Sequence, residues 1–263
     1  MPEIKAENVS YSYRDTPILD GVSFSLSGAM FVSVLGANGS GKSTLMKILD
    51  ALLPLSDGDI LIDGLSIKDE KNIPEIRKRI GFVFQDPDSQ FVSPVLEEDI
   101  AFGPENHGFG DDEIERRVSE SLSAVSLSSY RKRIPQLLSG GEKERAALAG
   151  ILAIDSDIVI LDEPFSMLDE NGRAEMLRLT RKAFSDKLIL YVTHRAEEAA
   201  DSDRVIVLDS GKIIAEGEPA DVLYSDAVEN TSIRLPLSVR IAKKLGLDKR
   251  PLSDDELLEA LCI

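Results

Sequence analysis

The sequence predicts an α/β fold built on a mainly parallel sheet, with an antiparallel β subdomain at the N-terminus and a helical insertion in the middle. The parallel strands are predicted from short apolar runs that are separated by polar, helix-like stretches, at residues 30–35, 157–161, 188–192 and 205–208. Strands that alternate with helices along a chain are typical of a parallel sheet covered by helices.

The other two parts of the predicted fold follow from two different patterns. Residues 4–13 and 22–26 alternate apolar with polar side chains, as half-buried antiparallel strands do. Between residues 96 and 152 the sequence shows only helical patterns, at 111–125 and 142–152. A helical insertion between two halves of an α/β core is the simplest interpretation.

The domain organisation follows from these patterns. We expect an α/β domain over residues 1–222, with its helical subdomain at about 90–155. Residues 223–263 are expected to form a C-terminal helical extension, in which Ser253 and Glu256 have the spacing of a capping box at a helix start.

Composition and charge exclude several classes of function. The 263 residues carry a formal net charge of −17 and a pI near 4.6, so the surface repels phosphate backbones and no binding to nucleic acid is expected. The single cysteine, Cys262, cannot form an intrachain disulfide, which suits a reducing compartment. The N-terminus lacks the pattern of a secretory leader, and no apolar run approaches the ~20 residues that span a bilayer.

The strand predicted at residues 30–35 runs into a glycine-rich turn with the pattern G-x-x-x-x-G-K-[ST]. Its residues are Gly36, Ala37, Asn38, Gly39, Ser40, Gly41, Lys42, Ser43 and Thr44. Glycines let backbone N–H groups turn around a phosphate, Lys42 supplies a positive charge for the outer phosphates, and the Ser43 hydroxyl can ligate Mg²⁺. The turn, between a strand and a helix, therefore predicts a site for a nucleoside triphosphate such as ATP.

Two acidic residues follow a second apolar strand. Asp162 comes at the end of the run 158–161, where it could hold Mg²⁺ directly or through water. Glu163 is one residue further, where it could orient a water molecule for attack on the γ-phosphate. Acids also end strands without any function, so the prediction depends on the phosphate-binding turn.

The segment Leu138–Ser139–Gly140–Gly141–Glu142 opens the helix predicted at 142–152. Ser139 and Glu142 have capping-box spacing, and two glycines at a helix start make an anion-binding surface. This pentapeptide resembles the LSGGQ or LSGGE signature of the ATP-binding subunits of ABC transporters, and the resemblance covers essentially the whole chain. It implies that Ser139, Gly140, Gly141 and Glu142 bind ATP.

The same resemblance implies further roles. Tyr13 is similar to the aromatic residue that stacks on adenine, with an edge-strand or core tyrosine as the alternative. Gln85 is similar to the glutamine that links the Mg²⁺ site to the helical subdomain, and His194 to the histidine that touches the γ-phosphate. Residues 166–169 resemble the loop that contacts the opposing subunit. His107 has no such counterpart and is expected to be a surface loop residue.

Three further segments resemble the energy-coupling-factor group, which includes the ATPases of cobalt, nickel and vitamin importers. They are residues 84–90, 94–106 and 235–245. The sequence departs from the family pattern at Val95, Met167, Glu170 and Arg195. None of these departures removes a catalytic group, so they concern partner contacts rather than hydrolysis.

The resemblance implies an importer ATPase that acts with ATP and Mg²⁺ on the cytoplasmic face of the cell membrane. Its expected partners are a second ATPase subunit, identical or non-identical, packed head-to-tail, and an integral membrane transport subunit. ATP would close the dimer, and hydrolysis assisted by Glu163 would reopen it. Two alternatives stay open: a soluble ABC-type ATPase of iron–sulfur assembly or DNA repair, and an inactive nucleotide-binding regulatory subunit.

Overall fold

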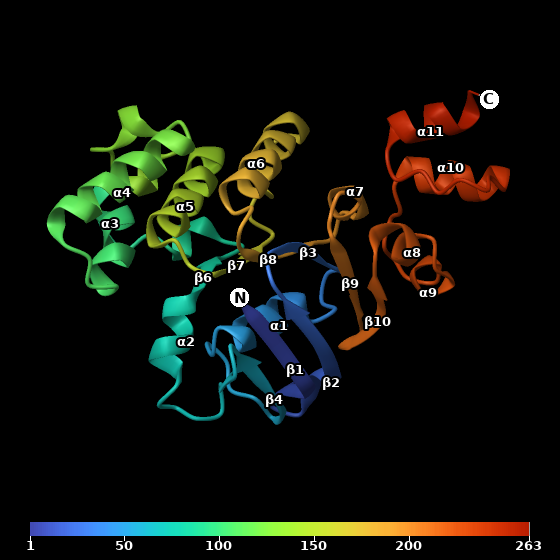
Figure 1. Cartoon of the computed structure of the whole chain (residues 1–263), viewed down its shortest axis with the longest axis horizontal. Coiled ribbons are helices and arrows are strands. Elements are labelled where there is room, and N and C mark those ends of the chain that lie inside the picture. The colour runs from blue at the N-terminus through green and yellow to red at the C-terminus, as the bar shows by residue number, and fades with distance from the viewer. Residues whose placement is uncertain (263) are drawn as a thin grey trace. The chain divides into compact units, whose positions relative to one another are not determined.

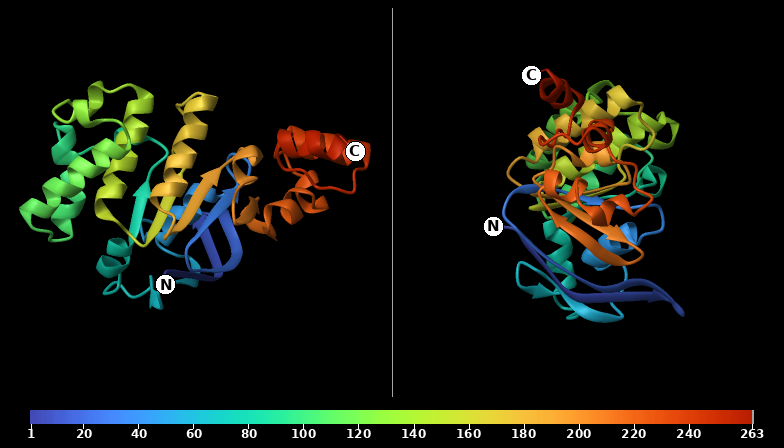
Figure 2. Two further views of the ribbon diagram at one scale, coloured as in Figure 1. Left: turned by 45° about the horizontal axis from the view of Figure 1, so that its top comes forward. Right: turned by 90° about the vertical axis from the view of Figure 1, so that its right-hand side faces the viewer.

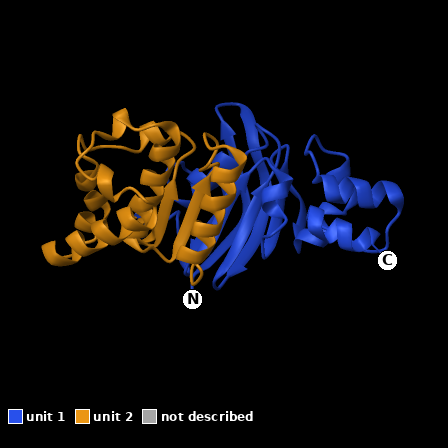
Figure 3. Cartoon of the chain, turned by 90° about the horizontal axis from the view of Figure 1, so that it is seen from above, with its two compact units in different colours: residues 1–73, 188–263 blue, residues 74–187 orange. Residues whose placement is uncertain are grey.

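The computed structural model describes residues 1–262 and divides into two compact units (Figure 3). The first unit contains residues 1–73 and the chain from residue 188 onward, and the second contains residues 74–187. The second unit is therefore an insertion in the sequence of the first. Both units combine strands with helices, which confirms the predicted α/β class.

An antiparallel sheet with the strand order β2-β1-β4-β5 forms the N-terminal part of the first unit (Figure 1). Its strands are β1 (Glu3–Tyr13), β2 (Thr16–Ser27), β4 (Asp57–Ile62) and β5 (Leu65–Ser66). Ile4 of β1 pairs with Leu26 of β2 and with Ile62 of β4, and all three side chains are buried. The antiparallel pairing predicted from the alternating pattern is confirmed.

The first unit also contains strands of a largely parallel sheet. They are β3 (Met30–Leu35), β8 (Leu188–Thr193), β9 (Arg204–Asp209) and β10 (Lys212–Gly217). β3 runs parallel to both β8 and β9, and only β10 is antiparallel to its neighbour β9. Leu35 and Thr193 form the last pair of β3 and β8, so the segments that begin at Gly36 and His194 leave the sheet at the same edge.

The second unit is mostly helical, with two parallel strands. Its helices are α2 (Ile73–Arg79, across the boundary of the units), α3 (Leu96–Asn106), α4 (Asp111–Ala124), α5 (Gly140–Ile154) and α6 (Glu170–Ala183), and its strands are β6 (Ile80–Val83) and β7 (Ile158–Asp162). No strand occurs between residues 96 and 152, all of which the structure describes, as the sequence predicts. Short 3₁₀ turns lie at Pro87–Ser89, Ser128–Tyr130 and Pro135–Leu137.

His107 differs from its expectation as a surface loop residue. It is half-buried directly after α3, and its ring nitrogens lie 2.9 Å from the carbonyl oxygen of Gly103 and 3.2 Å from that of Lys78. The ring therefore connects the last turn of α3 to the backbone of α2, which contains Lys78. His107 therefore has a structural role at the end of α3.

The C-terminal part of the chain belongs to the first unit. Its helices are α7 (Ala196–Ala199), α8 (Pro219–Leu223), α9 (Asp226–Glu229), α10 (Leu237–Leu245) and α11 (Asp254–Leu261). Leu235 and Val239 belong to the same buried cluster as Leu35 of β3 and Val207 of β9. α10 and α11 lie side by side (Figure 1 and Figure 2). Within residues 1–262, every helix is too short or too polar to span a lipid bilayer.

The start of α11 corrects one detail of the sequence prediction. Ser253 Oγ accepts a hydrogen bond from the backbone N–H of Glu256, as a capping box requires. The Glu256 carboxylate, however, accepts from the N–H of Leu252, at 2.7 Å, and not from that of Ser253. The cap therefore forms with its returning hydrogen bond displaced by one residue.

Candidate active site

The turn between β3 and α1 (Lys42–Leu49) brings its own backbone very close to neighbouring groups. Gly41, directly before α1, has a φ of 105°, which glycine tolerates and other residues avoid. A Cβ at Gly36 would lie 2.3 Å from the carbonyl oxygen of Leu208 and 2.5 Å from Ser40 Oγ, so a side chain does not fit there. The N-terminal N–H groups of α1 and its dipole favour an anion at this turn.

Two polar side chains inside this turn fit a phosphate ligand. Lys42 is buried, and its Nζ donates hydrogen bonds to the carbonyl oxygens of Gly36 (2.8 Å) and Ala37 (3.0 Å). Ser40 Oγ is also buried and has no hydrogen-bond partner among residues 1–262. A buried hydroxyl without a partner is costly, and a phosphate oxygen would relieve that cost. The turn therefore suits a polyphosphate.

The other residues of the turn differ in their accessibility. Asn38 and Gly39 are exposed at its tip, and Ala37 is half-buried. Ser43 and Thr44 are half-buried in the first turn of α1. Their hydroxyl groups therefore lie at the helix start, where the predicted phosphate and metal contacts would form.

His194 follows the last residue of β8 and is exposed. Thr193 Oγ1 donates to Glu198 Oε2 at 2.6 Å and accepts from the backbone N–H of Arg195 at 3.0 Å. The hydroxyl of Tyr191 donates to the same Glu198 oxygen at 2.8 Å. The backbone on both sides of His194 is thus fixed, at the same sheet edge as the phosphate turn. Sequence reasoning missed Glu198, which stands in an unremarkable polar helix.

In the second unit, the parallel pairing of β6 and β7 brings two predicted site residues together. Val83 pairs with Leu161, so the chain leaves both strands at one edge, towards Gln85 and Glu163. Gln85 Nε2 donates to Glu163 Oε2 at 3.2 Å. Asp162, the last residue of β7, is 2% exposed.

Glu163 has an unusual backbone conformation. Its φ is 47°, in the left-handed region that residues other than glycine seldom adopt. Such a conformation persists only where the surroundings hold it, and it often marks a functional position. The half-buried Glu163 side chain is therefore presented by a strained turn directly after the buried strand.

The segment 138–142 begins α5 with a complete capping box. The Ser139 N–H donates to Glu142 Oε2 at 2.7 Å, and Ser139 Oγ accepts from the Glu142 N–H at 3.4 Å. The first of these bonds is the main reason why the pKa of Glu142 lies below its ordinary value. A Cβ at Gly140 would lie 2.8 Å from Met167 Sδ, and one at Gly141 would lie 2.6 Å from a methyl carbon of Leu168.

Tyr13 lies at the hairpin end of β1, paired with Thr16. Its ring is 63% exposed and packs edge-on against Tyr11, with 6.1 Å between the ring centroids. β1 lies between β2 and β4 in the sheet, so Tyr13 is not on an edge strand, and its exposure rules out a core position. An exposed aromatic face is available for stacking.

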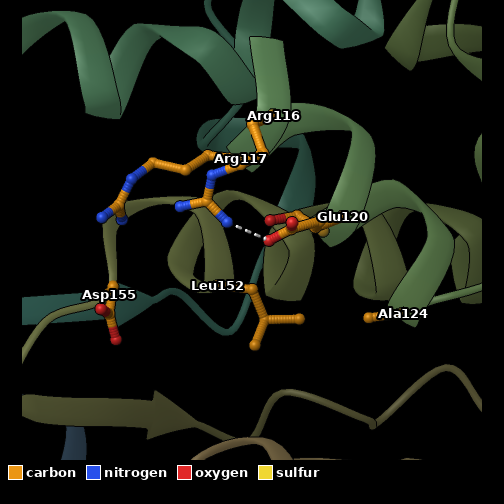
Figure 4. A pocket seen from close by; sticks show the side chains of 7 residues that line it. Arg116, Arg117, Glu120, Ala124, Leu152 and Asp155 are labelled. Atoms are coloured by element: carbon orange, nitrogen blue, oxygen red, sulfur yellow. Dashed lines mark hydrogen bonds and ion pairs between the residues drawn. The ribbon is translucent and has the colours of Figure 1, made fainter. Parts of the chain in front are cut away.

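The second unit also contains a pocket of about 260 Å³ between α4 and the end of α5 (Figure 4). Its arginines are already engaged: Arg116 pairs with Glu113 and Glu120, and Arg117 Nη1 donates to the carbonyl oxygen of Ala153 at 3.0 Å. The pocket is lined by other residues than those of the predicted ATP site. Arg116 forms ion pairs within α4, and Arg117 connects α4 to the backbone of α5.

The predicted Mg²⁺ ligands have suitable chemistry. Ser43, Gln85 and Asp162 offer a hydroxyl, an amide and a carboxylate oxygen, which are the hard donors that Mg²⁺ prefers. Within residues 1–262, no three His, Cys, Asp or Glu side chains gather in a group that could hold a metal ion by themselves. Each of the three predicted ligands can therefore donate an oxygen atom to Mg²⁺.

The fold and these motifs define a class of protein. Residues 19–166 match the family model of the ABC transporter. Because this match covers more than half of the chain, and strand, phosphate turn and signature occur in it, the chain belongs to the ABC transporter family of ATPases. It is an ATP-binding, ATP-hydrolysing enzyme.

Relatives narrow the class further. The energy-coupling factor transporter ATP-binding protein EcfA1 of Symbiobacterium thermophilum is 44% identical, over 99% of this chain and 97% of that protein. The structure of cbiO1 from Clostridium perfringens, part of the ABC transporter complex cbiONQ, has a TM-score of 0.76 and 34% identity, covering 92% of this chain and 98% of that one. The chain is therefore an ATPase subunit of the energy-coupling factor type.

A third similarity concerns the nucleotide and the dimer. The dimeric structure of an ATP-binding cassette in a post-hydrolysis state, bound to ADP and Pi, has a TM-score of 0.74 and 28% identity, over 82% of this chain and 98% of that one. Together with the full-length relatives, it favours the transporter ATPase over the soluble ATPases and the inactive subunit that the sequence left open.

Proposed function

We propose that this chain is the energising subunit of an energy-coupling factor importer for a metal ion or a vitamin. The observation that carries the proposal is the 44% identity, over 99% of this chain, to the ATP-binding protein of an energy-coupling factor transporter. The hydrogen bond of 3.2 Å between Gln85 and Glu163, at the end of a buried strand, supports its hydrolytic part. That bond joins Glu163, the proposed catalytic residue, to the segment 84–106 of this chain, which we propose contacts the membrane subunit.

The first unit would bind the triphosphate. Backbone N–H groups of residues 36–44 surround the phosphates, and Lys42 exchanges its bonds to the turn's carbonyl oxygens for bonds to the outer phosphates. Tyr13 stacks on the adenine, and His194 contacts the γ-phosphate. Ser40 Oγ gains the partner that it lacks in this structure.

The second unit would carry the hydrolytic group. Gln85 and Asp162 of this unit, with Ser43 of the first unit, would hold Mg²⁺, which neutralises charge on the phosphates when bound. Glu163 orients the attacking water and accepts its proton, and Gln85 fixes the direction of the Glu163 carboxylate. The strained backbone at Glu163 keeps this carboxylate in one orientation.

Two ATPase subunits would act as a head-to-tail dimer, with residues 139–142 of one completing the nucleotide site of the other. The exposed hydroxyl of Ser139 and the start of α5 offer an anion-binding surface to that nucleotide. ATP closes the dimer, and hydrolysis reopens it. The second subunit is either a copy of this chain or a related ATPase.

The proposed contact with the integral membrane subunit is the segment 84–106, on the cytoplasmic face of the membrane. Its side chains Val92 and Phe102 are 66% and 51% exposed. Asp99 holds the segment together by accepting from the N–H groups of Val92 (2.7 Å) and Ser93 (2.8 Å). Burial raises the pKa of Asp99, and these two bonds counteract the shift.

The hydrolytic assignment is tested by Glu163→Gln, with Glu175→Gln, an exposed glutamate of α6, as the matched control. We expect Glu163→Gln to lower ATP turnover by roughly a hundredfold or more while ATP binding stays within about threefold, because only the water-activating group is lost. Parental turnover in Glu163→Gln would refute the assignment. The control is expected to keep parental turnover.

The importer assignment is tested by affinity purification of the tagged chain from detergent-solubilised membranes of its native cell. Recovery of a polytopic membrane protein supports the proposal, and the presence or absence of a second ATPase shows which dimer forms. Recovery of soluble partners alone would refute the importer role.

A further inference from the structure

A buried glutamate of α5 is bonded to the loop that follows Glu163. Glu144 is 2% exposed, and its Oε1 accepts a hydrogen bond of 2.7 Å from the backbone N–H of Met167. Met167 lies in the loop between β7 and α6, four residues after Glu163. One side chain of α5, the helix that the signature segment 138–142 opens, therefore holds the backbone of the loop that follows the proposed catalytic carboxylate.

The same loop is held from its other side by α6. Arg173 Nη1 donates to the carbonyl oxygen of Leu168 at 2.9 Å, and the Asp169 carboxylate accepts from the N–H of Gly172 at 2.8 Å. Phe165 anchors the loop in the core, at 1% exposure. Two charged side chains thus bond to the backbone of the loop, Arg173 from α6 and Glu144 from α5.

Two side chains of the loop lie against the start of α5. A Cβ on Gly140 would meet Met167 Sδ at 2.8 Å, and a Cβ on Gly141 would meet a methyl carbon of Leu168 at 2.6 Å. The loop therefore packs directly on the segment 139–142, which is proposed to bind nucleotide. The loop connects the two proposed functional elements of the second unit.

Burial of the Glu144 carboxyl costs folding free energy. Its Oε2 is buried and has no hydrogen-bond partner among residues 1–262. Burial raises the pKa of Glu144 to about 7, although the Met167 N–H, Arg173 on α6, the Ser166 hydroxyl and Arg145 on α5 all act in the opposite direction. An apolar side chain would fill the same space without this cost, which points to a function for the carboxyl.

We propose that Glu144 is a positioning residue for ATP hydrolysis: through Met167 it fixes the loop 164–169 against α5 and so holds the strained backbone of Glu163 in its working orientation. The inference rests on the proposed role of Glu163. Glu144 is 2% exposed and bonded to the loop, so we expect it to act on turnover and not on ATP binding.

The test compares Glu144→Gln with Glu144→Leu in the complete ATPase complex. Gln keeps an oxygen that accepts the Met167 N–H, and we expect its kcat at pH 7 within about threefold of the parent. Leu leaves the Met167 N–H without its side-chain acceptor, and we expect kcat to fall about tenfold or more with KM for ATP within about threefold. A Leu variant with parental kcat, or one whose KM rises as kcat falls, would overturn the proposal.

A pH profile separates positioning from packing. The ionised carboxyl of Glu144 accepts the Met167 N–H more strongly than its neutral form, so the ratio of parental kcat to that of Glu144→Gln should rise as pH increases from 6 to 8. A ratio that stays constant over this range would overturn the proposal. This comparison does not depend on the folding of the Leu variant.

Failure of the inference is distinguishable from failure of the proposed function. If Glu163→Gln turns over at the parental rate, the proposed role of Glu163 fails, and with it the positioning of that residue. If Glu163→Gln is inactive while both Glu144 variants behave as the parent at every pH, the proposed function stands and only the inference about Glu144 is refuted.

Discussion

Replacing Glu144 by Gln should make the stability of the protein less sensitive to pH. Burial raises the pKa of Glu144 from its ordinary value of 4.5 to about 7, so the folded chain binds this proton more tightly than the unfolded chain does. The stability that depends on this proton is present below pH 4.5 and is lost as pH rises to about 7. At about 1.4 kcal/mol for each pKa unit, the loss amounts to about 3 kcal/mol.

The assay is urea unfolding of the parent and of Glu144→Gln between pH 5 and pH 8.5. The difference between their free energies of unfolding cancels the other titrating groups, and it should shift in favour of Glu144→Gln by about 3 kcal/mol across this range. The exposed Glu175→Gln variant removes one surface carboxylate and serves as the control. If the difference in free energy of unfolding is the same at pH 5 and pH 8.5, the argument that burial disfavours the ionised form of Glu144 is refuted.

Three further predictions follow from packing and capping. Gly36→Ala should weaken ATP binding at least about tenfold in a nucleotide titration, because its Cβ would lie 2.3 Å from the Leu208 carbonyl oxygen; unchanged affinity would contradict the geometry of the turn. Val239→Ala, fully buried in α10, should lower the free energy of unfolding by about 2 kcal/mol, and Leu258→Ala, 60% exposed, by less than about 0.5; equal effects would show that α10 is not part of the core. Ser253→Ala removes the cap of α11 and should destabilise that helix by about 1 kcal/mol, seen as faster amide exchange there with parental ATPase activity; unaltered exchange would count against the cap.

The sequence predicts the fold best where residue patterns are strong. Buried strands such as β3, β7 and β8 appear as apolar runs, and α4 and α5 appear as helical patterns at nearly their observed bounds. β4 was not predicted, because it begins Asp57–Gly58–Asp59, residues that are poor strand formers. β10 was missed because its sequence, KIIAEG, shows no clear alternation of apolar and polar residues. It forms a strand where it pairs with β9.

The candidate site was predictable where chemistry demands a motif. The phosphate turn, the signature segment and the acids after β7 could be named from residue types and spacing. The positioning residues could not, because their role depends on tertiary contacts. Glu144 stands among charged residues in a helix that could equally face solvent, and its burial arises only when the loop after Glu163 packs over it. Glu198 was missed because its hydrogen bonds to Tyr191 and Thr193 form only in the folded chain.

The position of Leu35 in the buried cluster has a consequence for synthesis of the chain. Leu35 precedes the phosphate turn, and the cluster that covers it is completed by Leu235 and Val239, two hundred residues later. A chain of which only the first 222 residues have been synthesised contains the whole turn but lacks the last members of that cluster, which are Leu223, Val228, Ile233, Leu235 and Val239. Nascent chains are therefore expected to complete the packing behind β3 only near the end of translation.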